Sequence, residues 1–205
     1  MFIEMRTYEL RPGTVAAFEE CFVEGLTARL QFSPLGGLWR TEIGGLNQVI
    51  HIWPYESFEE RERIGQEARK TGKWPPKTHE FIITQESKII QLAPFSPPCE
   101  ERKLGNLYEF RTYTYLPGTM PTVLERFGEV MAARAAVSPL VMAGHTIMGP
   151  LNQFIHVWAY KDSAERNRLR AEASKTVKGW PPQTREFLVK QENMWMVPLA
   201  CSPLK

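Results

Sequence analysis

Cysteine is scarce in this sequence, and the few that occur form no recognisable site. Cys21, Cys99 and Cys201 are an odd number at wide spacing without a CxxC pair, which is typical neither of a disulfide framework nor of a zinc site. This usage favours a reducing compartment. Glycine-rich nucleotide loops, GxSxG elbows and zinc motifs are also absent, so no motif supports the commonest nucleotide-binding or hydrolase functions.

Excess charge and long apolar runs are lacking as well. The 25 basic and 23 acidic residues leave a formal net charge of +2 without a basic run, so we expect neither nucleic acid nor a membrane as a partner. No apolar run is long enough to span a bilayer, and the first residues do not form a secretory signal. With 43% hydrophobic residues the composition is ordinarily globular, and we predict a cytoplasmic location.

What the sequence does contain is an internal repeat. The segment EMRTY at 4–8 recurs as EFRTY at 109–113, displaced by 105 positions (109 − 4). The longest match pairs GGLNQVIHIWPY at 44–55 with GPLNQFIHVWAY at 149–160 in the same register. One extra residue in the second copy then shifts the match of WPP at 74–76 to 106 positions (180 − 74).

The length of the repeat indicates two domain-sized modules. Solenoid repeats run to roughly 20–50 residues, which is far shorter than this period. The segment APFSPPCEERK at 93–103 is rich in proline and then in charge, as linkers often are. We predict a first module at residues 1–95, a linker at 96–105 and a second module at 106–205.

Each copy predicts the same order of elements, βαββαβ. The first strand of each copy alternates with period two and ends at a Pro-Gly pair, the helices follow threonine caps and capping boxes, and Gly-Gly or Gly-Pro marks the hairpin. In the first copy the expected strands lie at about 2–11, 38–43, 47–55 and 80–92, with helices from Thr14 and from Ser57 to about 71. This order predicts an α+β protein made of two tandem ferredoxin-like modules.

Alternation divides each predicted sheet into an aliphatic face and a polar, aromatic face. In the third strand Ile50 and Ile52 point one way, while His51, Trp53 and Tyr55 point the other. We expect the aliphatic face to lie against the helices. The polar, aromatic faces of the two copies are too aromatic to lie against water, so we expect the antiparallel sheets to pack on each other through them, face to face, as an α/β barrel.

These motifs together resemble the NIPSNAP family. The resemblance is carried by Arg-Thr-Tyr with a following Pro-Gly, then Gly-x-Leu-Asn-x-x-x-His-x-Trp-x-Tyr, then Glu-Arg-x-Arg and a Trp before the last strand, and both copies contain the pattern. It implies a barrel of the dimeric α/β-barrel superfamily in a group with no well-defined biochemical role. The wider superfamily includes small monooxygenases, isomerases and haem proteins, so the fold alone does not select an activity.

Eight residues of the polar, aromatic faces are candidates for binding a ligand, and each type occurs in both copies. The histidines could carry protons or ligate a metal or haem, or they could be hydrogen-bonded core residues. The arginines and tyrosines could hold a carboxylate, or the arginine could pair with the neighbouring glutamate. The tryptophans could line a pocket or anchor the core. The candidates are Arg6, Tyr8, His51, Trp53, Arg111, Tyr113, His156 and Trp158.

Other duplicated residues are weaker candidates. Trp74 and Trp180 could line the same pocket, again with a core role as the alternative. Arginines at 61, 63, 166 and 168 lie on charged helices, where we expect a solvated face. No His, Asp or Glu stands beside the duplicated histidines at a metal-ligand spacing, so we predict no metal site.

Three hypotheses for function remain open at this point. The first is a small-molecule binding module, as in a cofactor-independent oxygenase or isomerase, with a pocket reached from solvent. The second is a non-enzymatic structural or interaction module with a closed barrel centre. The third is haem binding through a duplicated histidine. Catalytic residues, the formation of a homodimer, and pairing of the modules within or between chains are left undecided.

Overall fold

The computed structural model describes all 205 residues and contains the βαββαβ order twice. The first half consists of β1 (Phe2–Leu10), α1 (Val15–Arg29), β2 (Gly37–Ile43), β3 (Gln48–Tyr55), α2 (Phe58–Lys70) and β4 (Ile82–Leu92). The second consists of β5 (Leu107–Tyr115), α3 (Met120–Val137), β6 (Leu140–Met148), β7 (Gln153–Tyr160), α4 (Ser163–Thr176), a short 3₁₀ helix (Arg185–Phe187) and β8 (Leu188–Pro198). None of the helices has the length and apolar character needed to cross a membrane.

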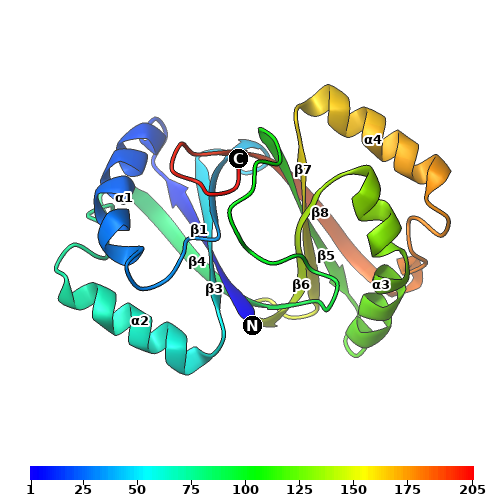
Figure 1. Ribbon diagram of the computed structural model, residues 1–205, viewed down its shortest axis with the longest axis horizontal. Coiled ribbons are helices and arrows are strands. Elements are labelled where there is room, and N and C mark those ends of the chain that lie inside the picture. Colours follow the sequence, from blue (N-terminus) through cyan, green and yellow to red (C-terminus); the bar gives the residue numbers. More distant parts are fainter.

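The eight strands close into one barrel in the order β1-β3-β2-β8-β5-β7-β6-β4. Two antiparallel seams join the halves, β2 with β8 and β4 with β6. In Figure 1 the two sheets face each other across the middle of the molecule, with α1 and α2 on the outer side of one and α3 and α4 on the outer side of the other. The predicted fold is confirmed, and the two halves pair within one chain.

Local signals explain where the helices and hairpins form. Ser57 accepts a hydrogen bond from the Glu60 N–H at 3.2 Å, and Asp162 accepts one from the Glu165 N–H at 2.8 Å, as the predicted caps require. In the turns of the β2–β3 and β6–β7 hairpins, Asn47 and Asn152 adopt positive φ angles of 56° and 58°. Asparagine tolerates this left-handed conformation better than most residues do, which accounts for the duplicated Leu-Asn pair.

The barrel interior is filled by side chains from both halves. They form one cluster of buried residues: Ile3, Met5, Trp39, Ile50, Ile52, Ile90, Tyr108, Phe110, Val141, Met142, Ile155, Val157, Ala159, Met196 and Leu204. Because this cluster contains side chains from all eight strands, neither half has a complete interior without the other.

The prediction of which sheet face meets the helices is wrong. Ile50 and Ile52 lie inside the barrel, whereas His51 and Trp53 lie beneath the helical layer, with the His51 ring centroid 5.3 Å from that of Phe22 in α1. An eight-stranded barrel is just wide enough for its side chains to fill, and it offers no water to polar groups. The aliphatic faces therefore point inward, and the polar, aromatic faces are left for the helices to cover.

The segment between β4 and β5 runs against the carboxyl terminus. The Leu104 N–H donates to the Lys205 carbonyl at 2.8 Å, and Arg102 and Leu204 form a single parallel bridge. Cys99 and Leu104 pack on the barrel interior from this segment. The division of the chain into modules at 1–95 and 106–205 with a linker at 96–105 stays a prediction.

Trp39 offers a test of the shared interior. Its fully buried ring lies 5.4 Å from Tyr108 and 5.1 Å from Phe110, both in the other half. Trp39→Ala should lower the free energy of unfolding by about 3–5 kcal/mol because it leaves a cavity in this interior. Urea unfolding followed by far-UV circular dichroism should still give one transition.

The matched control is Ile43→Ala in the same strand, where the side chain is 54% exposed and the expected change is below about 0.5 kcal/mol. Two separate unfolding transitions in the wild-type protein, or equal costs for the two variants, would contradict a shared interior.

Candidate functional site

Each half contains a pocket between the outer face of its sheet and its two helices. The first-half pocket has a volume of about 250 Å³ and is lined mainly by Glu4, Arg6, Arg29, His51, Trp53, Arg61 and Trp74. The second-half pocket has a volume of about 420 Å³ and is lined mainly by Arg111, Tyr113, Arg134, His156, Trp158, Arg170 and Trp180. Both lie outside the barrel, on the faces that the sequence predicted to meet at its centre.

The strand registers bring the candidate residues together. Seven of the eight line one of the two pockets, and Tyr8 lies directly behind His51, with ring centroids 5.0 Å apart. The residues directly opposite each other on neighbouring strands are Arg6 and His51, Glu4 and Trp53, Arg111 and His156, and Glu109 and Trp158. The duplicated sequence motifs therefore form one duplicated site.

An indole hydrogen bond defines the state of each histidine. Trp53 Nε1–H donates to His51 Nδ1 at 2.7 Å, and Trp158 Nε1–H donates to His156 Nδ1 at the same distance. Both histidines are 1% exposed. Burial and then the nearby Arg6 charge lower the pKa of His51 to about 3, and burial with Arg111 lowers the pKa of His156 well below its usual value. Both imidazoles are therefore neutral near pH 7.

The position of the remaining proton follows from this hydrogen bond. Because Nδ1 accepts from the indole, the single proton of the neutral imidazole is on Nε2. Nε2 of His51 and Nε2 of His156 are buried and have no hydrogen-bond partner in the protein. Each pocket wall thus contains an N–H donor whose acceptor is not supplied by the chain.

This tautomer does not fit a histidine that binds a metal or haem iron. A ligating imidazole presents a lone pair to the metal and donates its other ring N–H to an acceptor. Here the other ring nitrogen accepts, so Nε2 carries a proton in place of the lone pair. No group of three His, Cys, Asp or Glu side chains gathers elsewhere in a way that could hold a metal ion.

A buried glutamate lies beside the imidazole in the first half. Arg61 donates to Glu4 through two nitrogens at 2.7 and 2.8 Å, Arg6 Nε donates at 3.0 Å, and Ser87 Oγ donates at 3.0 Å. Burial alone would raise the pKa of Glu4, but the hydrogen bonds and charges of Arg61 and Arg6 outweigh it and lower the pKa to about 2. Glu4 is therefore ionised, and its role is to orient the arginines.

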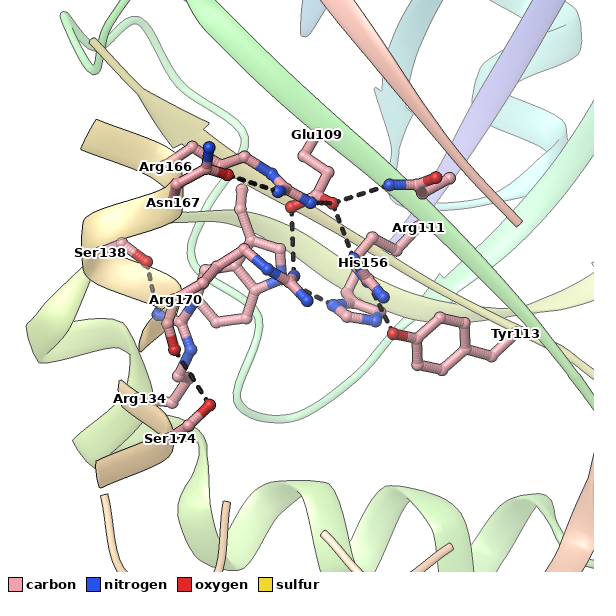
Figure 2. Close-up of polar contacts among 12 residues, drawn as sticks. Glu109, Arg111, Tyr113, Arg134, Ser138, His156, Arg166, Asn167, Arg170 and Ser174 are labelled. Atoms are coloured by element: carbon pink, nitrogen blue, oxygen red, sulfur yellow. Dashed lines mark hydrogen bonds and ion pairs between the residues drawn. The ribbon is translucent and has the colours of Figure 1, made fainter. Parts of the chain in front are cut away.

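The second half contains the same arrangement with one more arginine. Figure 2 shows Glu109 among three arginines. Arg111 donates to it at 2.7 Å, Arg166 at 2.5 Å and, more loosely, Arg170 at 3.4 Å. Asn193 also donates, at 2.9 Å. Burial raises the pKa of Glu109, but these contacts outweigh it and lower the pKa to about 2.

The helical arginines that were predicted to lie on a solvated face fall into two groups. Arg61 and Arg166 do not lie there, because both bind the buried glutamates. Arg63 and Arg168 are exposed, as expected. Helix periodicity could not separate these two pairs, since the buried carboxylate that attracts the first pair comes from a distant strand.

One pair of buried arginines was not predicted from the sequence. Arg29 and Arg134 lie in the last turns of α1 and α3, are 3% and 1% exposed, and form no ion pair. Each guanidinium carbon lies 4.2 Å from the centroid of the Trp53 or Trp158 ring. Burial lowers the pKa of both side chains, and arginine still keeps its charge. The signal that could have identified them is that they occupy equivalent positions in the two copies of the repeat, 105 positions apart (134 − 29).

The buried histidines predict a dependence of stability on pH. Their pKa values lie below the usual 6.5 in the folded state, so the unfolded chain binds more protons as the pH falls below about 6.5, and the folded state loses stability. The expected slope is about 1.4 kcal/mol per pH unit for each histidine between pH 6 and 5. Below about pH 4.5, Glu4 and Glu109 add a further loss.

Urea unfolding at several pH values measures this slope. His51→Gln combined with His156→Gln should flatten it between pH 6.5 and 4.5, whereas the exposed His79→Gln serves as a matched control with the wild-type slope. An unchanged slope in the double variant would show that the two imidazoles are not buried in their neutral form.

The comparison with known proteins also detects the two copies of the repeat. The NIPSNAP family profile matches residues 3–97 and again residues 108–203. NipSnap homologs 3A and 3B of Homo sapiens are 30% identical over all of this chain and 86% of their own length. A NipSnap homolog of Dictyostelium discoideum is 31% identical over 82% of this chain and 73% of its own length.

Solved structures with much lower sequence identity share the same fold. A putative monooxygenase from Fusobacterium nucleatum superposes with a TM-score of 0.67 over 97% of this chain and 92% of its own, at 10% identity. Another from Lactobacillus acidophilus gives 0.64 over 96% and 92%, at 9% identity. The TM-scores show that these proteins share the barrel fold, and the low sequence identities say nothing about shared chemistry. With both halves matched by the profile, the chain belongs to the NIPSNAP family.

Proposed function

We propose that the protein binds a small carboxylate-bearing molecule in each of its two pockets. The observation that carries this proposal is the buried Nε2–H of His51 and of His156, which has no acceptor in the protein. A buried donor left unpaired costs about 1–3 kcal/mol, and a ligand oxygen at this point recovers that cost. We therefore expect the donor in each pocket to bind an acceptor atom of a ligand.

The surroundings of each donor favour an anion. Arg6 and Arg29 line the first-half pocket with His51, and Arg111 and Arg134 line the second with His156. Arg29 and Arg134 have no carboxylate partner, so their charge is available to a ligand. Clefts with one sign of charge concentrate ligands of the opposite sign.

The tryptophans favour a flat ligand. Trp53 and Trp74 lie in the first-half pocket with ring centroids 5.8 Å apart, and Trp158 and Trp180 lie in the second with centroids 6.1 Å apart. Aromatic walls of this kind suit an aromatic or unsaturated group next to the carboxylate.

Oxygenase or isomerase chemistry is a second candidate, and the neutral imidazole is what favours it. An N–H of neutral histidine can polarise a carbonyl whose oxygen gains negative charge during the reaction. A base is also needed to remove a substrate proton, and Glu4 and Glu109, tied to arginines with pKa values of about 2, are weak bases. The arrangement thus supports binding and polarisation more strongly than a complete reaction.

The other predictions stand apart from this proposal. The barrel interior also contains a pocket of about 220 Å³, lined by Met5, Ile50 and Phe110 of the interior cluster and by polar side chains such as Glu86 and Lys88, so its centre is not fully closed. The ligand proposal rests on the two pockets outside the barrel. Haem binding through a duplicated histidine is disfavoured by the Nε2–H tautomer. The possible homodimer and the cytoplasmic location stay predictions.

Titration with benzoate, the simplest flat carboxylate, tests the proposal. Isothermal calorimetry at pH 7 should show two sites per chain. His51→Ala should remove one site and His156→Ala the other, each by a loss of affinity of at least about tenfold, since a charge-assisted hydrogen bond is lost. The exposed His79→Ala should keep both sites.

A second variant separates binding from folding. His51→Gln places an amide N–H near the position of Nε2 and should retain more affinity than His51→Ala, while both give the circular dichroism spectrum of the wild-type protein. Equal and normal binding of benzoate by the wild-type protein and both alanine variants would refute the role of the imidazoles.

A further inference from the structure

The two pockets have the same core but differ at their rims. Positions that match at a displacement of 105 keep the imidazole, the indole and the buried glutamate, and they change Gly65 to Arg170 (170 − 65) and Glu62 to Asn167 (167 − 62). After the extra residue of the second copy, His79 corresponds to Arg185 at a displacement of 106 (185 − 79).

These changes make the second-half pocket more cationic. Four arginines and two glutamates line the first-half pocket, for a net charge of +2. Four arginines and no carboxylate line the second, for a net charge of +4. The second-half pocket is also larger, about 420 Å³ against about 250 Å³. It has both the space and the charge for an additional anionic group.

Arg170 is held only loosely by its carboxylate partner. Its single contact with Glu109, at 3.4 Å, is long compared with the roughly 2.7–2.9 Å of a strong charge-assisted hydrogen bond. Glu109 already accepts shorter hydrogen bonds from Arg111 and Arg166, and the Arg170 side chain is 37% exposed. Figure 2 shows the Arg170 guanidinium extending toward Glu109 and His156.

Unpaired donors are also more numerous in the second half. In the first half the His51 Nε2 is the one buried side-chain nitrogen of the site without a partner, whereas in the second half Arg134 Nε and Arg166 Nε join His156 Nε2. Arg185, on the rim, forms no ion pair and its side chain makes no hydrogen bond. Of these three residues, Arg134 and His156 line the second-half pocket, so a ligand there meets one more unpaired buried donor than a ligand in the first.

We infer that the second-half pocket takes a dicarboxylate and the first-half pocket a monocarboxylate, and that Arg170, where the first half has Gly65, sets the difference. This inference rests on the proposed binding of carboxylates. One carboxylate of the ligand meets His156 Nε2–H and Arg134, and the other meets Arg170 on the rim, where Arg185 adds its charge. In the first half Gly65 has no side chain at the position of Arg170. The guanidinium of Arg69 lies beside Gly65, but Glu62 lines the same pocket, so a second carboxylate there meets a cation together with an acidic group.

Calorimetry of the full chain with benzoate and with isophthalate, its dicarboxylate counterpart, tests the inference. Isophthalate should bind one site about tenfold more tightly than the other, because one extra charge-assisted contact is worth about that factor. His156→Ala should remove the tight site. Benzoate should bind the two sites within about threefold of each other.

Substitution of Arg170 shows whether this residue is the cause. Arg170→Ala should lower the affinity of the tight site for isophthalate about tenfold and change benzoate binding less than about threefold. Arg168→Ala, in the same helix with a 64% exposed side chain, removes the same charge outside the pocket and should leave both affinities unchanged. Gly65→Arg should strengthen isophthalate binding in the first half.

The outcomes separate this inference from the proposed function. Two benzoate sites with no preference for isophthalate, or equal losses in Arg170→Ala and Arg168→Ala, overturn the inference and leave carboxylate binding intact. Failure of both probes to bind overturns both.

Discussion

The hydrogen bond from an indole N–H to Nδ1 of a buried imidazole is the interaction on which the site depends. It places the proton of the neutral ring on Nε2, and burial keeps the ring neutral. The same bond makes the histidine unsuitable as a metal ligand and suitable as a donor to a ligand oxygen. Since Trp53 and Trp158 follow His51 and His156 by two positions on a strand, strand geometry alone brings each pair onto one face.

The barrel explains why this face lies where a ligand can reach it. Closing eight strands within one chain leaves a narrow interior whose middle is packed with apolar side chains, while His51, Trp53 and their counterparts in the second half point outward. The helices cover most of that outer face and bury the imidazoles. They leave Arg6 and Arg170 partly exposed, so each pocket has a buried hydrogen-bond donor inside and a positive charge near its opening.

Much of the architecture could be predicted from the sequence, because the repeat, the period-two strands and the capping boxes are local signals. Alternation also showed correctly that His51 and Trp53 share a face and that Ile50 and Ile52 share the other. It could not show which face meets the helices, since both faces of each sheet are covered. That choice follows from the narrow barrel interior, which exists only once β2 pairs with β8 and β4 with β6.

The charged residues of the site were predicted less well, for a physical reason. Arg61 follows the pattern of an exposed helical residue, and its partner Glu4 lies 57 positions away in sequence. The residues next to Arg29 in the sequence do not indicate that it is buried, because its stabilising contacts are with the face of Trp53 and the hydroxyl of Tyr55. Contacts of this kind depend on how helices lie on the sheet, and only the folded structure shows them.

Nitrogen-15 NMR of the histidine side chains at pH 7 can determine which ring nitrogens of His51 and His156 are protonated. Long-range correlations between ring nitrogens and carbon-bound protons identify which nitrogen is protonated. We expect both His51 and His156 to be neutral, with the proton on Nε2. A proton on Nδ1, or a doubly protonated ring in either half, would contradict this expectation.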